Sequence, residues 1–120
     1  MPTKPTDDLA TRKCVPCEGG VPALTRAEAT ALLKQLTGWK LVGRGKRIRK
    51  EWTVENFLAG IDFFKRVARV AEKQGHHPDL HLEGYRNLAI EIWTHAIDGL
   101  SENDFILAAR IDRLPILLKN

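Results

Sequence analysis

The stretch from Phe57 to Pro78, FLAGIDFFKRVARVAEKQGHHP, predicts the longest helix of the chain and the point at which that helix stops. Gly75 and Pro78 end the helical pattern, since glycine favours a helix C-terminus and proline cannot continue a helix. Over about five turns before them, apolar residues recur every three or four positions, which is the spacing of one helix face. These residues are Phe57, Ile61, Phe64, Val67, Ala68 and Ala71.

The segments before this helix predict a first helix and a hairpin. Thr25 and Glu28 have the spacing of a capping box, and leucines follow at helical intervals, so we expect a helix over residues 26–36. Two short runs expected to be extended, 39–42 and 48–54, flank the turn Gly43-Arg-Gly-Lys46. Short strands joined by a glycine-bracketed turn are typical of a β-hairpin.

The segments after Pro78 predict a second strand pair and a third helix. Apolar and polar residues alternate over 80–83 and again over 88–95, which puts His95 at the end of a strand, on the face opposite the aliphatic residues. Ser101 and Asp104 have capping-box spacing, and the helix that follows stops before Pro115. The order α-β-β-α-β-β-α predicts a two-layer α+β domain, with a four-stranded antiparallel sheet and three helices on one face.

The other face of such a sheet stays open, and we expect Trp93 and Trp52 on it among polar groups. Open, mixed faces are often oligomer surfaces, so self-association into a dimer or tetramer is a hypothesis. The apolar tail 114–118 is expected either to bind a partner or to fold back over its own domain.

Length and composition indicate one ordinary globular domain. The chain has 120 residues, of which 43% are hydrophobic and 28% charged. We expect one domain over residues 24–120, preceded by a leader over 1–23. The chain has no apolar run long enough to span a membrane, and its N-terminus does not resemble a secretory signal. A cytoplasmic location is therefore expected.

The net charge of +4 comes largely from the basic stretch 40–50. Such a stretch can bind phosphate or nucleic acid. A solvated hairpin turn is the favoured interpretation, because no nucleic-acid-binding motif accompanies it.

The two cysteines, Cys14 and Cys17, form a C-x-x-C pair in the leader. Such a pair supplies half of a structural zinc site, and His76 and His77 would have to complete it. Adjacent histidines rarely ligate one metal, because neighbouring side chains diverge. We therefore expect the leader to be a loop that packs against the domain or stays mobile, with zinc binding as the minor alternative.

All four histidines fall between residues 76 and 95. Histidine can donate and accept a proton near neutral pH and can bind a metal, so this concentration suggests acid-base chemistry or metal ligation. Glu72 precedes His76 by one helical turn and is expected to orient its imidazole. Taken one at a time, a surface pair for Glu72 and His76, a helix stop for Pro78 and a cap role for Asp104 are the better interpretations.

One series of residues runs through the second half of the chain: Glu72, His76, His77, Pro78, Tyr85, His95 and Asp104. Together with the helix start at Leu24, the Trp39 strand and the closing stretch 99–112, this series resembles the pterin-4a-carbinolamine dehydratase family. The resemblance covers most of the chain and implies the same α-β-β-α-β-β-α fold.

The resemblance implies an enzyme, a hydro-lyase, that removes water from 4a-hydroxytetrahydrobiopterin without a metal or other cofactor. The product would be quinonoid dihydropterin, in the recycling of the pterin that aromatic amino acid hydroxylases use. His77 and His95 would transfer protons and His76 would hold the pterin or the leaving group, with Glu72, Pro78 and Asp104 in support. Which histidine acts as acid and which as base stays open.

The chain departs from the family pattern in two places. It has one extra residue between Pro78 and Tyr85, and Gly84 is expected to absorb it in a β-bulge. Leu80 and His81 replace an aromatic pair of the animal members, and His81 is expected to be exposed. A non-catalytic binding, assembly or transcription-cofactor module of the same fold is the alternative function, although the full histidine set favours the enzyme.

Overall fold

Four strands form one antiparallel sheet in the computed structural model, which describes residues 9–12, 14 and 22–120. The strands lie in the order β1-β2-β4-β3, so β2 and β4 are central. The bounds are α2 (Arg26–Leu33), β1 (Lys40–Val42), β2 (Arg47–Thr53), α3 (Phe57–Gln74), β3 (Asp79–Glu83), β4 (Asn87–Ile92), the 3₁₀ helix η1 (His95–Ile97) and α4 (Glu102–Asp112).

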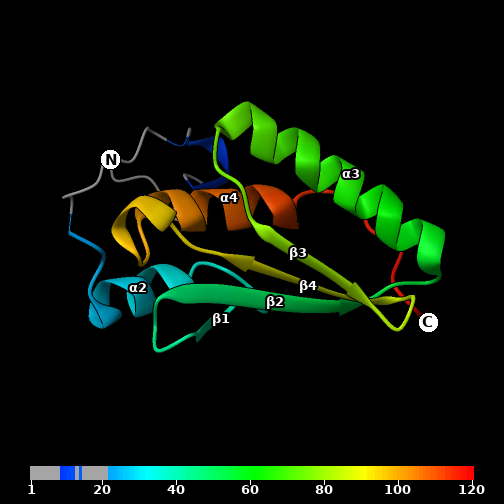
Figure 1. Ribbon diagram of the computed structural model, residues 1–120, viewed down its shortest axis with the longest axis horizontal. Helices are drawn as coiled ribbons and strands as arrows, with labels where there is room; N and C mark the ends of the chain where they lie inside the picture. Colours follow the sequence, from blue (N-terminus) through cyan, green and yellow to red (C-terminus); the bar gives the residue numbers. More distant parts are fainter. Residues whose placement is uncertain (1–8, 13, 15–21) are drawn as a thin grey trace.

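Helices pack on one face of this sheet and bury its aliphatic side chains (Figure 1). Ile48 of β2 pairs with Ile92 of β4, and both are completely buried, as is Ile90. Burying a side chain of this size contributes roughly 1.5–3 kcal/mol. Helix α4 is buried along most of its length and α2 adds Ala29 to the same core. The predicted two-layer α+β fold is confirmed.

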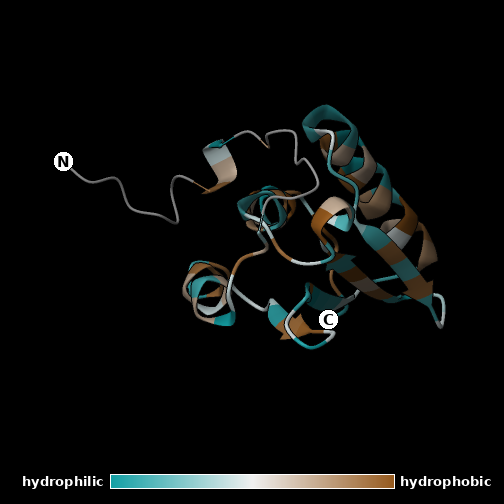
Figure 2. Cartoon of the chain, turned by 60° about the vertical axis from the view of Figure 1, so that its left-hand side comes forward, coloured by the Kyte–Doolittle hydropathy of each residue, from teal (hydrophilic) through white to brown (hydrophobic). Residues whose placement is uncertain are grey.

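The long helix α3 forms as predicted, but its buried face lies slightly to one side of the predicted stripe. Phe63 is 1% exposed and Phe57 is 52% exposed, although the periodicity had favoured Phe57 and Phe64 for the core. Val67 and Ala71 are buried as expected. Hydrophilic residues follow the outer side of the helix (Figure 2). Neighbouring phenylalanines look alike in a hydropathy pattern, so only packing against the sheet selects between them.

Three local predictions were wrong. The first helix ends at Leu33 rather than Leu36 and continues as hydrogen-bonded turns. Strand β4 ends at Ile92, three residues before His95, because Thr94 pairs instead with Gly99 and closes a loop that contains η1. No β-bulge forms at Gly84, since the β3–β4 ladder is continuous and Gly84 lies in the turn with a φ of 55°.

The open face of the sheet carries Trp93 but not Trp52. Trp52 lies on the helix side, where its ring packs edge-on against Trp39 and Phe63. The ring centroids are 5.9 Å apart for Trp39 and 5.3 Å apart for Phe63. The C-terminal tail folds back over its own domain, because the Leu118 backbone pairs with Val54 at the end of the sheet.

Part of the N-terminal leader packs into the core. Leu9 is completely buried and Ala10 is 7% exposed. The Arg12 carbonyl oxygen accepts hydrogen bonds from the Arg110 guanidinium of α4, at 3.0 and 2.5 Å. The leader was expected either to pack against the domain or to stay mobile. Its described residues, 9–12 and 14, pack against the domain. In the described part of the chain, no helix has the length and apolar character needed to cross a membrane.

Candidate active site

The C-terminal end of α3 sets the direction in which the chain continues to His76 and His77. Gly75 adopts a φ of 67°, a left-handed conformation that glycine reaches without strain. Its N–H donates to the Glu72 carbonyl and the N–H of His76 donates to the Ala71 carbonyl, which is the bonding pattern of a Schellman motif. The chain therefore leaves the helix at a fixed angle just before the two histidines.

His76 is held by the buried carboxylate of Asp104. Its Nε2 lies 2.5 Å from Asp104 Oδ1, and the His76 side chain is only 11% exposed. Asp104 is completely buried and its Oδ2 accepts hydrogen bonds from the Thr94 hydroxyl and the Ser101 N–H, each at 2.8 Å. Asp104 therefore caps α4, as its spacing from Ser101 predicted, and also orients an imidazole.

The predicted pairing of Glu72 with His76 was wrong, because Glu72 contacts His77 instead. The distance from Glu72 Oε2 to His77 Nε2 is 2.5 Å, and both side chains are largely exposed. The left-handed turn at Gly75 explains the difference. It carries His76 toward Asp104 and brings the next residue back along the helix to Glu72.

His95 reaches the same region from η1. Its exposed ring stacks on the Trp93 indole, with 4.1 Å between ring centroids and 34° between planes. The loop closed by Thr94 and Gly99 places this stack beside the end of α3.

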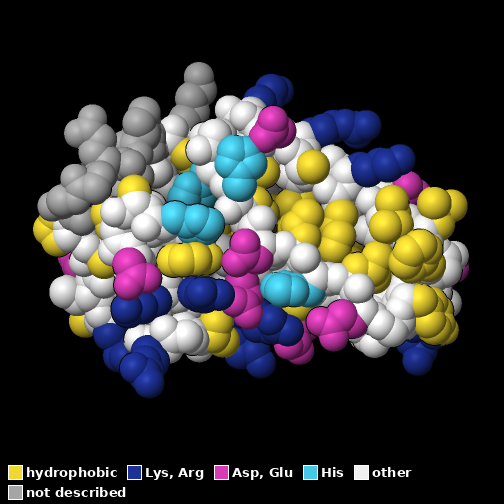
Figure 3. Space-filling model, viewed as in Figure 1, with side chains coloured by type: hydrophobic (Ala, Val, Ile, Leu, Met, Phe, Trp, Pro, Cys, Tyr) yellow, Lys and Arg dark blue, Asp and Glu magenta, His cyan; other side chains and the backbone are white. Residues whose placement is uncertain are grey.

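One pocket of about 460 Å³ brings His76, His77 and His95 together. Histidine side chains gather there, near the C-terminal end of α3 (Figure 3). The other lining residues are Cys14, Gln74, Gly75, Trp93, Thr94, Ala96 and Asn103. Glu72, Pro78 and Asp104 do not line the pocket themselves, and His81 lines a different hollow on the open sheet face.

Cys14 was expected in the leader, but its place in the pocket wall has no signal in the sequence. Its N–H donates to the Gln74 side chain at 2.9 Å and its thiol lies 3.6 Å from the Asn103 carbonyl oxygen. Burial raises the pKa of this thiol to about 11, and the charge of Asp104 adds to the rise. Among the described residues no group of three or more ligands could hold a metal. Cys17, the second residue of the proposed zinc pair, lies outside the described residues.

The basic stretch 40–50 is largely neutralised by acidic partners. Lys46 pairs with Asp98 and Lys50 pairs with Asp112, each at 2.9 Å. Arg47 and Arg49 both bind Glu91. Burial raises the pKa of Glu91, but the hydrogen bonds from the two arginines outweigh it and hold that pKa below its usual value. This pairing agrees with the interpretation as a solvated hairpin.

Comparison with known proteins identifies the family. A family model described as pterin 4 alpha carbinolamine dehydratase matches residues 22–114. The chain therefore belongs to the pterin 4 alpha carbinolamine dehydratase family, and the predicted membership of this family of hydro-lyases is confirmed.

Two relatives and one solved structure are similar over most of this chain. It is 52% identical over 112 residues to a protein of Arabidopsis thaliana named pterin-4-alpha-carbinolamine dehydratase 2, mitochondrial, covering 91% of this chain and 60% of that protein. It is 49% identical over 108 residues to a putative pterin-4-alpha-carbinolamine dehydratase of Nitrosospira multiformis, covering 90% and 93%. The crystal structure of a transcriptional coactivator/pterin dehydratase from Brucella melitensis superposes with a TM-score of 0.70 at 28% identity, covering 75% of this chain and 95% of that one.

Proposed function

We propose that this protein dehydrates 4a-hydroxytetrahydrobiopterin to quinonoid dihydropterin and water. The observation that carries the proposal is the single pocket lined by three imidazoles from two separate parts of the chain. Its volume of about 460 Å³ is in the range of small-molecule sites and suits a bicyclic heterocycle. The names of the relatives support the same reaction.

The reaction needs two proton transfers. A proton donated to the 4a-hydroxyl lets it leave as water with the electron pair of the C–O bond. A base removes a proton from a ring nitrogen, and the electrons of that N–H bond form the new C=N bond. Imidazole performs either step near neutral pH, and a positioned group of this kind accelerates a reaction by roughly 10²–10⁴-fold.

The environments of the three histidines suggest their roles. His77 and His95 are exposed, so their rings can exchange protons with water between turnovers. They are the proposed proton-transfer groups. His76 is almost buried and held by Asp104, which suits a residue that holds the pterin or the leaving group. Glu72 would orient His77, and Pro78 would fix the exit of the chain from the double histidine.

The physiological setting is also a proposal. Recycling of tetrahydrobiopterin would link the enzyme to an aromatic amino acid hydroxylase. The cytoplasm stays the predicted compartment, whereas the Arabidopsis relative is named mitochondrial. A dimer or tetramer also stays a prediction, and exposed apolar side chains such as Leu58 and Leu117, 66% and 64% exposed, are compatible with one.

A binding module is the second candidate, because the Brucella melitensis structure is described as a transcriptional coactivator as well as a pterin dehydratase. This role would use an exterior surface and would not require the histidine pocket. Loss of the pocket histidines would then leave binding intact, so the two functions are separable by mutation.

The test is the decay of the 4a-carbinolamine, followed by stopped-flow absorbance with purified protein. We expect His77→Ala and His95→Ala each to lower the rate by about a hundredfold or more, as loss of a proton-transfer group does. His81→Ala is the matched control, since His81 lies outside the pocket, and it should retain the wild-type rate. Normal turnover in both pocket variants would exclude the proposed mechanism.

A further inference from the structure

Each pocket histidine depends on a different partner for its orientation. Carboxylates contact the first two, Asp104 for His76 and Glu72 for His77. His95 has no such anchor, because its ring makes no hydrogen bond to another residue within the described part of the chain. Its ring contact is the Trp93 indole, at a centroid separation of 4.1 Å. An exposed imidazole on a short 3₁₀ segment samples several rotamers unless something restrains it.

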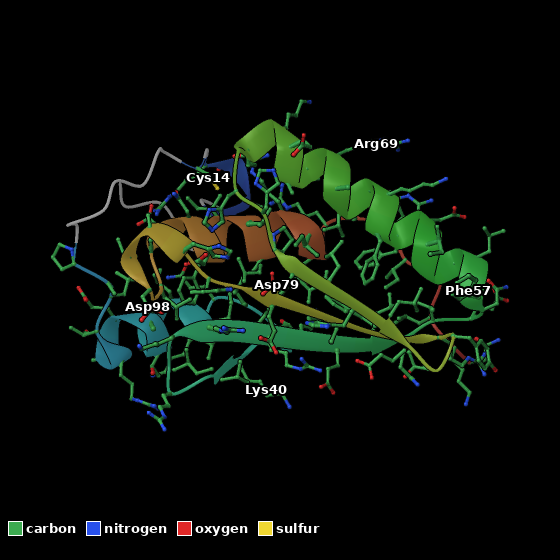
Figure 4. All side chains as sticks on the ribbon, in the orientation of Figure 1. Cys14, Lys40, Phe57, Arg69, Asp79 and Asp98 are labelled. Carbon is green, nitrogen blue, oxygen red and sulfur yellow. The ribbon has the colours of Figure 1, made fainter. Side chains whose placement is uncertain are left out.

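The indole of Trp93 is itself held from two sides. Its Nε1 donates to Asp79 Oδ2 at 3.2 Å, and the Arg47 guanidinium carbon lies 4.4 Å from the ring centroid. These partners come from the strands on either side of β4. Asp79 lies at the start of β3 (Figure 4), and its backbone partner on β4 is Glu91. Arg47 begins β2, one position beyond the Ile48–Ile92 pair. The sheet therefore fixes the plane of this indole.

A second layer of contacts fixes Arg47. Its guanidinium binds Glu91 Oε1 at 3.2 Å, while Arg49 binds the other oxygen of the same carboxylate at 2.6 Å. Glu91 is 17% exposed, so solvent screens these charge-assisted bonds only in part. Arg47 therefore stays over the indole through a network that spans two strands and ends at the pocket.

We propose that Trp93 is the positioning residue of His95, and that Asp79 and Arg47 act on His95 only through the Trp93 indole. The proposal rests on the proposed function, in which His95 transfers a proton. Aromatic stacking of this kind is worth roughly 0.5–1.5 kcal/mol, which corresponds to about a twofold to tenfold change in the population of the stacked ring. The His95 ring and the Arg47 guanidinium both contact this indole, at 4.1 and 4.4 Å from its ring centroid.

Kinetics and NMR together test this role. Trp93→Ala should lower kcat by about twofold to tenfold with little change in KM, since His95 loses orientation while the pocket keeps its other walls. In the wild type, the indole ring current should shift the His95 carbon-bound ring protons upfield, and Trp93→Ala should abolish that shift. His95→Ala assigns these resonances. His81→Ala, on the same face of the sheet, is the control for both measurements.

Conservative variants separate positioning from a general structural role. Trp93→Phe keeps a stacking ring and should restore most of kcat and of the upfield shift. Asp79→Ala removes the anchor of the indole and should cause a smaller loss than Trp93→Ala, whereas Asp79→Asn keeps an acceptor oxygen and should behave like the wild type. These single-site variants also cover the case in which Trp93→Ala fails to fold.

Three results would overturn the proposal. The first is an unshifted His95 resonance in the folded wild-type protein, and the second is a shift that survives Trp93→Ala. The third is a loss of turnover in Trp93→Phe as large as in Trp93→Ala. The NMR signature does not require turnover, so a protein without dehydratase activity would contradict the proposed function and leave the positioning of His95 separately measurable.

Discussion

Replacing Asp104 tests whether one buried carboxylate links the fold to the pocket. Three groups converge on it: the Ser101 N–H and the Thr94 hydroxyl at 2.8 Å, and His76 Nε2 at 2.5 Å. Asp104→Ala leaves all three without their acceptor in a site that is completely buried. Breaking a buried pair of this kind costs about 3–5 kcal/mol. A domain of this size has roughly 5–15 kcal/mol of stability, so the loss would be a large fraction of the whole.

Asp104→Asn separates the cap from the orientation of His76. The amide oxygen can still accept from Ser101 and Thr94, so we expect a smaller loss of about 1–3 kcal/mol. Its NH₂ group would face His76 Nε2 and require that nitrogen to accept rather than donate. The imidazole proton would then move to Nδ1, and turnover should fall although the protein remains folded.

Urea unfolding followed by tryptophan fluorescence measures these changes, and ¹⁵N chemical shifts of the imidazole report the His76 tautomer. Glu102→Gln is the matched control. Glu102 lies in the same helical turn but forms only a surface ion pair with Arg12, at 2.9 Å, so its loss should cost less than about 1 kcal/mol. If Asp104→Ala costs no more than Glu102→Gln, the buried carboxylate does not hold this site together.

Two further predictions concern the leader. Leu9→Ala should lower the free energy of unfolding by about 2–5 kcal/mol, because Leu9 is completely buried, whereas an unchanged urea midpoint would mean that the leader does not pack in solution. In a Cys17→Ser background, alkylation of Cys14 at pH 8 should be about a hundredfold slower than for a thiol with the ordinary pKa of 9.0, since burial raises its pKa to about 11 and the protonated form is unreactive. The rate should keep rising with pH up to about 11, and a plateau near pH 9 would contradict the assignment.

The sequence predicted the fold well, because its evidence for each element is local. Periodicity defined α3, and Gly75 with Pro78 defined where it ends. The prediction of which face of α3 is buried was less accurate, since Phe63 and Phe64 are adjacent and equally apolar. The end of β4 was also missed: the apolar alternation continues past Ile92, but Thr94 bonds to Gly99 and turns the chain.

The sequence predicted which histidines form the site, but it did not predict which carboxylate each of them contacts. Spacing suggested that Glu72 orients His76. Because of the turn at Gly75, Glu72 instead contacts His77, and His76 contacts Asp104. The contact between His76 and Asp104 joins residues 28 positions apart, so it depends on how α3 and α4 pack. Trp93 and Cys14 line the pocket for the same reason, and neither has a local signal for that role.

The most direct measurement is the rate of 4a-carbinolamine loss with a catalytic amount of the wild-type protein, compared with buffer alone. We predict many turnovers per protein molecule, and decay close to the buffer rate in the variant that combines His76→Ala, His77→Ala and His95→Ala. Wild-type decay no faster than in buffer, or full activity in the combined variant, would contradict a dehydratase built on these three imidazoles.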